Sequence, residues 1–126
     1  MKIALTFDDC YDSHLLFVKP LLEAYGFTAT FFVSGHYLTC CKKFQPKHLV
    51  DFDRGGFELG NHLNAHIDMT KCGLQHNILQ IKSVNDLFCK LGIETAISLA
   101  YPGYHVNNST KEAVKRAGIK FARGGN

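Results

Sequence analysis

Short runs of β-branched and aromatic residues alternate along this chain with longer segments whose apolar residues recur at helical spacing. This alternation is typical of repeated βα units, in which helices cover a largely parallel sheet. The predicted strands are residues 2–7, 28–33, 57–59, 96–101 and 119–122, and the predicted helices are residues 13–25, 46–54, 74–91 and 108–117. We therefore expect an α/β fold in which about five parallel strands alternate strictly with four helices.

The chain length limits how far this pattern can extend. Residues 1–126 suffice for one domain, but an eight-stranded barrel would need far more. We expect a partial or distorted (β/α) barrel, or an open sheet, in a single domain. Pro20 lies inside the first helical segment and can kink or split it. The last helix can be capped by Asn108, Ser109 and Thr110.

Composition excludes several classes of protein. Hydrophobic residues make up 46% and charged residues 20%, as in an ordinary folded, soluble protein, so neither disorder nor a membrane protein is expected. The net charge of +3 is scattered, which argues against nucleic-acid binding. The first residues lead directly into a strand without the features of a signal peptide, so export is not supported.

The cysteines favour a reducing, cytoplasmic compartment. They are odd in number and show no framework spacing: Cys10, Cys40, Cys41, Cys72 and Cys89. The adjacent Cys40 and Cys41 have no CxxC partner, so ordinary thiols are favoured over half of a zinc site.

Polar residues follow the predicted strands at three places. These stretches are Thr6-Phe7-Asp8-Asp9, residues 61–66, and Ala100-Tyr101-Pro102-Gly103-Tyr104. The carboxyl ends of strands are where α/β folds bind ligands. We therefore expect the three stretches to meet at one site.

Asp8 and Asp9 are adjacent carboxylates at the end of a predicted buried strand. They repel each other and are costly to desolvate unless a cation or a proton relieves them. Both can serve one site only if the strand ends here, because neighbours in a strand face opposite sides. Taken alone, the pair fits a solvated turn equally well.

His62 and His66 lie four residues apart, so on a helical turn they would share a face and could bind one metal ion. Singly, each is more often a core or surface histidine. Two imidazoles and one carboxylate, however, form a facial triad with open positions for water and substrate. The second carboxylate is then left to act as a general base.

These motifs resemble those of the NodB-homology polysaccharide deacetylases of carbohydrate esterase family 4. Residues 6–9 are similar to the family's first motif, residues 58–66 to its second motif with its lead-in, and residues 100–102 to its third. The run from Ala29 to Val33 is similar to the family's second strand. The resemblance spans essentially the whole chain.

The resemblance implies a function and a role for each site residue. Zinc or a similar divalent ion would bind Asp9, His62 and His66, and Asp8 would deprotonate the metal-bound water that attacks the acetyl carbonyl. The metal would polarise the carbonyl oxygen, and the backbone amide near Gly103 would help to stabilise the oxyanion. Contacts to the carbohydrate and the oxyanion are expected from Tyr101, Pro102, Gly103 and Tyr104. Tyr104 could stack on a sugar ring or pack under a loop.

The sequence departs from the family pattern in several ways. Many members have an arginine that holds the catalytic aspartate where this chain has Ala100, so the partner of Asp8 is unidentified. The usual glycine after Asp-Asp is Cys10, and the order of Gly103 and Tyr104 is reversed. The late motif, whose histidine protonates the leaving amine, has no match here. No motif assigns that role to His14, His36, His48, His76 or His105.

Three functions remain open from the sequence. The first is an active deacetylase of N-acetylated sugars, such as chitooligosaccharides or peptidoglycan. The second is a catalytically inactive fragment or paralogue that lacks the late acid motif and binds metal and carbohydrate. The third is hydrolysis of a related amide in a small molecule. Because a half-open barrel leaves strand edges and apolar faces uncovered, self-association is also expected.

Overall fold

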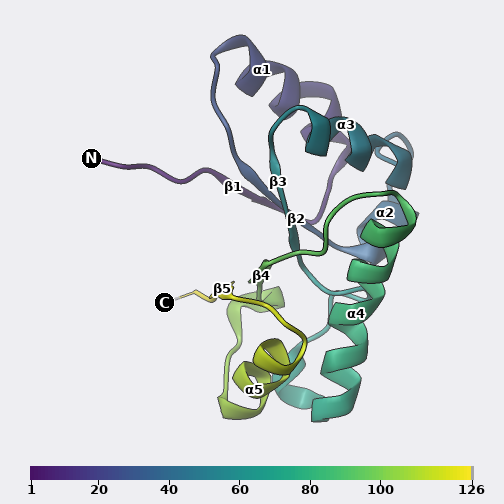
Figure 1. The fold of residues 1–126 in the computed structure, drawn as a ribbon, viewed down its shortest axis with the longest axis vertical. Helices are drawn as coiled ribbons and strands as arrows, with labels where there is room; N and C mark the ends of the chain where they lie inside the picture. Colours follow the sequence, from purple (N-terminus) through teal and green to yellow (C-terminus); the bar gives the residue numbers. More distant parts are fainter. Residues whose placement is uncertain (126) are drawn as a thin grey trace.

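The computed structural model describes residues 1–125 and contains one parallel sheet of five strands in sequential order. The strands are β1 (Thr6–Asp8), β2 (Thr30–Val33), β3 (Glu58–Asn61), β4 (Ser98–Ala100) and β5 (Phe121–Arg123). The sheet curls into an open half-barrel, so its two edge strands meet at their carboxyl ends through Asp8 and Arg123 (Figure 1). This architecture confirms the expected incomplete barrel.

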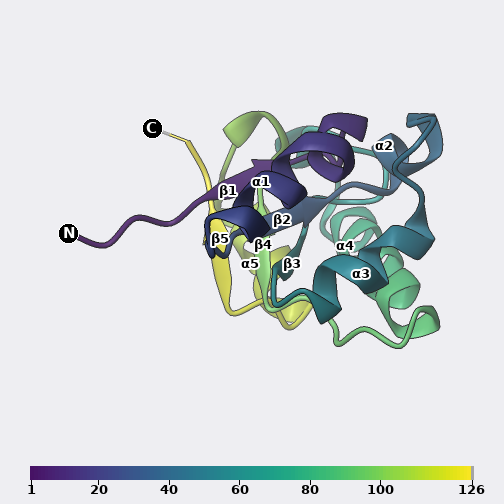
Figure 2. The same ribbon diagram turned by 90° about the horizontal axis from the view of Figure 1, so that it is seen from above.

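The helices follow the prediction with one exception. They are α1 (Lys19–Ala24), α2 (Gly35–Cys40), α3 (Leu49–Arg54), α4 (Leu74–Lys90) and α5 (Asn108–Arg116), and a π-helical turn, His14–Val18, leads into α1. The predicted strict alternation with four helices is wrong between β2 and β3, where both α2 and α3 lie. In both ribbon views α2, α3 and α4 lie on one side of the sheet, and the chain ends lie on the other (Figure 2).

Local sequence explains where two of the helices begin. The π-helical turn ends at Val18, and α1 begins at Lys19 with Pro20 in its first turn, which confirms the split predicted there. The cap of α5 is Asn107, one residue before the predicted capping segment. Its side chain accepts a hydrogen bond from the amide of Thr110 at 2.9 Å while its own backbone stays extended.

The two faces of the sheet differ in polarity. On the helix-covered face the fully buried ring of Phe31 stacks on Phe7, with centroids 5.1 Å apart, and meets Phe52 edge-on at 4.8 Å. Burying such a ring contributes roughly 1.5–3 kcal/mol. On the opposite face Glu58 accepts hydrogen bonds from the hydroxyls of Thr30 and Ser98 at 2.9 and 2.5 Å. The core therefore lies between the sheet and the helices.

Strand β1 is shorter than predicted. Pairing with β2 begins where the carbonyl of Leu5 accepts the amide of Thr30 at 3.0 Å, and residues 2–5 lie outside the strand. The neighbouring strand offers no earlier partner, so Ile3 remains 72% exposed. Within residues 1–125, no helix combines the length and the apolar character that crossing a membrane requires.

Candidate active site

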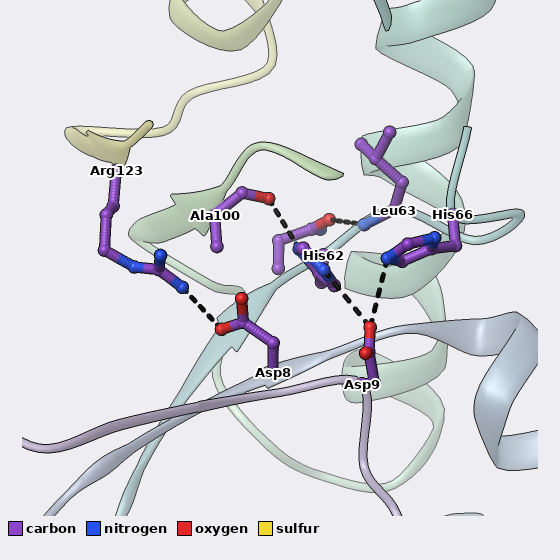
Figure 3. A network of polar contacts seen from close by, with 8 residues as sticks. Asp8, Asp9, His62, Leu63, His66, Ala100 and Arg123 are labelled. Carbon is purple, nitrogen blue, oxygen red and sulfur yellow. Dashed lines mark hydrogen bonds and ion pairs between the residues drawn. The ribbon is translucent and has the colours of Figure 1, made fainter. Parts of the chain in front are cut away.

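The carboxyl ends of the strands bring the two aspartates and two histidines of the first two motifs together with Arg123 (Figure 3). Asp8 ends β1 and Asp9 follows it, His62 follows the last residue of β3, and Arg123 ends β5. Parallel strands in sequential order place all these ends on the same edge. The expected convergence of the first two motifs is therefore present.

Asp9 turns away from the strand that Asp8 completes. Its backbone takes a φ of 81°, in the left-handed region, while its amide still bonds to the carbonyl of Phe32 at 3.1 Å. The carboxylate oxygen Oδ1 of Asp9 then lies 3.2 Å from Nε2 of His62 and 3.1 Å from Nε2 of His66. The end of β1 thus permits the two adjacent carboxylates to point into one site.

The predicted helical turn from His62 to His66 is wrong. The segment is a loop in which Leu63 and His66 have φ values of 65° and 51°. The loop begins with Asn61, whose Oδ1 accepts the amide of Leu63 at 3.0 Å and whose Nδ2 donates to the carbonyl of Ile81 at 2.8 Å. The two imidazoles therefore converge through a local reversal of the backbone rather than through helical spacing.

Two helices fix this loop in place. At the start of α2 the amides of Gly35 and His36 donate to the carbonyls of Leu63 and Asn64 at 3.2 and 2.6 Å. On the other side the amide of Asn64 donates to the carbonyl of Gln80 in α4 at 3.3 Å. A Cβ atom on Gly35 would collide with the exposed side chain of Asn64 and lie 3.1 Å from its carbonyl oxygen, so a larger residue here requires that side chain to rotate and the loop backbone to yield slightly.

The ring of His62 is oriented by the end of β4. Its Nδ1 donates to the carbonyl of Ala100 at 2.7 Å, which leaves the Nε2 lone pair directed at the site. Burial lowers the pKa of His62, and the hydrogen bond to Ala100 and the charges of Asp8 and Asp9 only partly oppose this effect. A neutral imidazole anchored through its second nitrogen is the usual arrangement of a metal-ligating histidine.

The residues fit a divalent ion such as zinc. One ligand atom from each of Asp9, His62 and His66 lies within 4.8 Å of the others. Ligands about 2.0–2.1 Å from a tetrahedral zinc ion lie about 3.3 Å apart, close to the two separations measured from Asp9. In addition, Oδ1 of Asp9 is buried without a hydrogen-bond partner, which leaves it available for a cation.

Asp8 is held apart from this group by Arg123. The guanidinium Nη2 donates to Oδ1 of Asp8 at 2.5 Å, and it lies 5.2 Å from the ring centroid of Phe32. Burial lowers the pKa of Arg123, but the hydrogen bond and charge of Asp8 outweigh it, so the pKa rises. Sequence reasoning missed this partner of Asp8. The one sequence signal for Arg123 was its position directly after the last predicted strand, since Asp8 also follows its predicted strand directly.

The third motif is divided between core and surface. Tyr101 and Pro102 are buried, and the amide of Tyr101 donates to the carbonyl of Arg123 at 2.9 Å. Gly103 and Tyr104 are exposed, with Tyr104 at 54%. Of the four residues expected to contact the substrate, Gly103 and Tyr104 are therefore the exposed ones.

An open hollow of 350 Å³ adjoins the two aspartates. It is lined by Thr6, Phe7, Asp8, Asp9, Tyr11, His14, Tyr104 and Arg123. Cys10, which replaces the usual glycine, is buried with a φ of 68°, and burial raises the pKa of its thiol. A protonated, buried thiol is neither a ligand nor a nucleophile, so the chemistry of the site lies with the carboxylates and imidazoles.

Comparison with known proteins decides the family. Residues 1–122 match the model of the family described as polysaccharide deacetylase. The chain belongs to the polysaccharide deacetylase family. The match covers both aspartates and both histidines of the site, so the resemblance noted in the sequence is confirmed.

Individual relatives exceed the chain in length, and the solved structures among them agree with it in fold. Deacetylase PplD of Streptococcus pyogenes, in complex with acetate, is 23% identical with a TM-score of 0.89, over 98% of this chain and 55% of that one. The Xyl-CE4 domain of a multidomain xylanase from the hindgut metagenome of Trinervitermes trinervoides is 28% identical with a TM-score of 0.80, over 97% and 57%. An uncharacterized 30.6 kDa protein of Geobacillus stearothermophilus is 33% identical over 86 residues, or 68% of this chain and 31% of that protein. The matches thus cover between 31% and 57% of the length of these relatives.

Proposed function

We propose that this chain carries the metal-binding and catalytic-base residues of a hydrolase that removes acetyl groups from N-acetylated sugars. The observation that carries the proposal is that the adjacent carboxylates of Asp8 and Asp9 contact different groups. Oδ1 of Asp9 faces the Nε2 atoms of His62 and His66, whereas Asp8 is hydrogen-bonded to Arg123 and lies outside that group. Membership of the polysaccharide deacetylase family supports the reaction class.

The proposed roles follow from these contacts. Asp9, His62 and His66 hold a divalent ion, most suitably Zn²⁺, which supplies a Lewis acid for an acetyl carbonyl. Asp8 takes the proton of the attacking water, and Arg123 orients its carboxylate through the hydrogen bond at 2.5 Å. Ala100 fixes the ring of His62 through its carbonyl. Tyr104 and the amide near Gly103 contact the substrate beside this centre.

The test is acetate release by the zinc-loaded chain and by two variants that separate the aspartates. Asp8→Asn should keep one zinc ion and lose acetate release, because it removes the base and leaves the ligands intact. Asp9→Asn should lose zinc and activity together. Zinc content is measured by elemental analysis, and the substrates are N-acetylated chitooligosaccharides, peptidoglycan fragments and small acyl amides.

Each outcome selects one of the functions left open by the sequence. Release from sugars that disappears in Asp8→Asn supports the deacetylase. Faster cleavage of small acyl amides than of sugars would replace the polymer with a small-molecule substrate. Zinc and oligosaccharide binding without any release would instead favour an inactive metal- and carbohydrate-binding part. Failure to bind zinc would contradict the proposal altogether.

A further inference from the structure

His14 is a buried histidine to which neither the metal group nor the proposed base assigns a role. It opens the π-helical turn His14–Val18 and is only 8% exposed. Its ring packs edge-on against Phe7 and Tyr11, with centroids 5.6 and 5.7 Å away, and lies tilted to Phe31 at 5.8 Å. An apolar side chain would satisfy all three of these contacts.

The packing does not explain why a side chain with two ring nitrogen atoms occupies this position. Its Nδ1 is buried without a hydrogen-bond partner, and within residues 1–125 the structure gives no hydrogen bond to either ring nitrogen. Such unpaired buried nitrogen atoms are costly and rare, and they persist where a ligand or a function uses the group. Since Nδ1 alone is sealed from solvent, Nε2 is the nitrogen that meets the surroundings.

Those surroundings are the hollow beside the aspartates. His14 lines it together with Asp8, Asp9, Tyr104 and Arg123, and its volume of 350 Å³ lies within the range of about 300–1,000 Å³ usual for ligand sites. Tyr104, which also lines the hollow, is 54% exposed, and the guanidinium of Arg123 lies 5.6 Å from its ring centroid. Donors and one aromatic face around two carboxylates suit a sugar, which carries hydroxyl and acetamide oxygens.

The protonation state of His14 is set by its position. Burial lowers its pKa, and the charges of Asp9 and Asp8 oppose this only in part. The ring is therefore neutral near pH 7 and carries one proton. With no acceptor at Nδ1, that proton belongs on Nε2, where solvent or a ligand can accept it.

We infer that His14 is a substrate-binding residue whose Nε2–H donates a hydrogen bond to an acceptor oxygen of the N-acetylated sugar in this hollow. The inference rests on the proposed function, because it names the group that holds the sugar whose acetyl group is removed. It also gives a reason for keeping a polar side chain among three aromatic rings. The role is binding and orientation, distinct from the metal ligands and from the base.

Two variants of similar length test this role. His14→Met removes the donor and fills the same space with an apolar chain, whereas His14→Gln retains an N–H near the position of Nε2. Binding of fully N-acetylated chitotetraose to the zinc-loaded proteins is measured by calorimetry, beside acetate release, zinc content and melting temperature. His76→Met on α4 serves as the control.

The expected results separate binding from folding. His14→Met should weaken chitotetraose binding about tenfold and raise KM, in line with the loss of one hydrogen bond, and His14→Gln should recover part of the loss. Zinc content should be unchanged, and the melting temperature of His14→Met should be equal or higher, because the unpaired buried nitrogen is gone. A structural role would lower the melting temperature without this recovery.

Two outcomes overturn the inference in distinguishable ways. If the wild-type chain binds chitotetraose and His14→Met binds it equally well, His14 is not a substrate contact and the proposed function stands. If the zinc-loaded wild-type chain neither binds chitotetraose nor releases acetate from any sugar, both the inference and the proposed function are wrong.

Discussion

Asp8 and Asp9 are neighbours in sequence, yet the structure gives them different surroundings. Asp8 still belongs to β1 and meets the guanidinium of Arg123, whereas Asp9 has left the strand with a φ of 81° and meets the two imidazoles. A residue in the left-handed region costs roughly 1–2 kcal/mol, so the turn at Asp9 is a strained feature kept by its surroundings. Under the proposed function, this turn would allow Asp9 to bind the cation while Asp8 accepts a proton.

Replacing Arg123 should separate proton transfer from metal binding. In Arg123→Gln the hydrogen bond from the guanidinium to Asp8 is lost, and we expect kcat for acetate release to fall about 10- to 100-fold, the usual range for a hydrogen bond between charged groups. Zinc content should stay unchanged, because Arg123 does not touch the proposed metal ligands. Arg116→Gln, which breaks only the exposed pair with Glu112, is the matched control. Loss of zinc in Arg123→Gln would contradict this role.

The positions and contacts of the site residues could be predicted from the sequence to different extents. The convergence of Asp8, Asp9 and the histidine loop could be predicted, because ends of parallel strands share an edge. The pairing of Asp8 with Arg123, 115 residues away, could not, because it depends on the curl of the sheet. The spacing of His62 and His66 predicted a helical turn, but turns with positive φ at non-glycine residues carry no reliable sequence signal.

At the scale of elements, the loop after β3 depends on two helices with very different sequence signals. Helix α4 was predicted almost to the residue, because its buried face repeats at helical spacing over many turns. Helix α2, Gly35–Cys40, was not predicted, because six residues are too few to show a period. Its first residues nevertheless hold the loop through the carbonyls of Leu63 and Asn64.

Changing Gly35 to alanine should therefore alter the loop that carries His62 and His66, although Gly35 itself is not a site residue. The added Cβ atom would displace the exposed side chain of Asn64 and lie 3.1 Å from its carbonyl oxygen, so the backbone of the loop that ends at His66 must yield by a few tenths of an ångström. We expect a loss of roughly 1–3 kcal/mol in the free energy of unfolding, as for other overpacked sites, and weaker zinc binding.

Urea denaturation and zinc titration measure the two effects of Gly35→Ala. Gly73→Ala is the matched control, because its added Cβ atom meets nothing within 4 Å. Equal zinc affinity in Gly35→Ala and the wild-type chain would show that the contact with α2 does not position the loop.

At the scale of the whole molecule, the half-barrel leaves surface that a closed barrel would cover. Strands β1 and β5 each have one neighbour in the sheet, so their outer edges are unpaired within residues 1–125. Near the start of β1, an open hollow of 440 Å³ is lined by Ile3, Leu5, Gly26, Phe27 and Thr28. Exposed edges and apolar patches of this kind favour association with further chain segments or with other copies.

We predict that the isolated chain self-associates through this surface. Light scattering should give a mass above that of one chain, and this mass should rise with protein concentration. Phe27→Lys should lower it, because Phe27 is 59% exposed and lines this hollow. Leu79→Lys is the control, since Leu79 is 64% exposed on α4, outside that hollow. A strictly monomeric wild-type chain that binds no hydrophobic dye would contradict the prediction.

The proposed metal ligands lie well before Arg123 in the sequence, so the ribosome makes the two parts of the site at different times. Asp9, His62 and His66 have all been synthesised once residue 66 is added. The carbonyl that orients His62 comes with Ala100, and the partner of Asp8, Arg123, comes last. At about 5–20 residues per second, several seconds pass between His66 and Arg123. Under the proposed function, a nascent chain would therefore hold all its metal ligands before the partner of the proposed base exists, and a bound ion would act as a template around which the later strands dock.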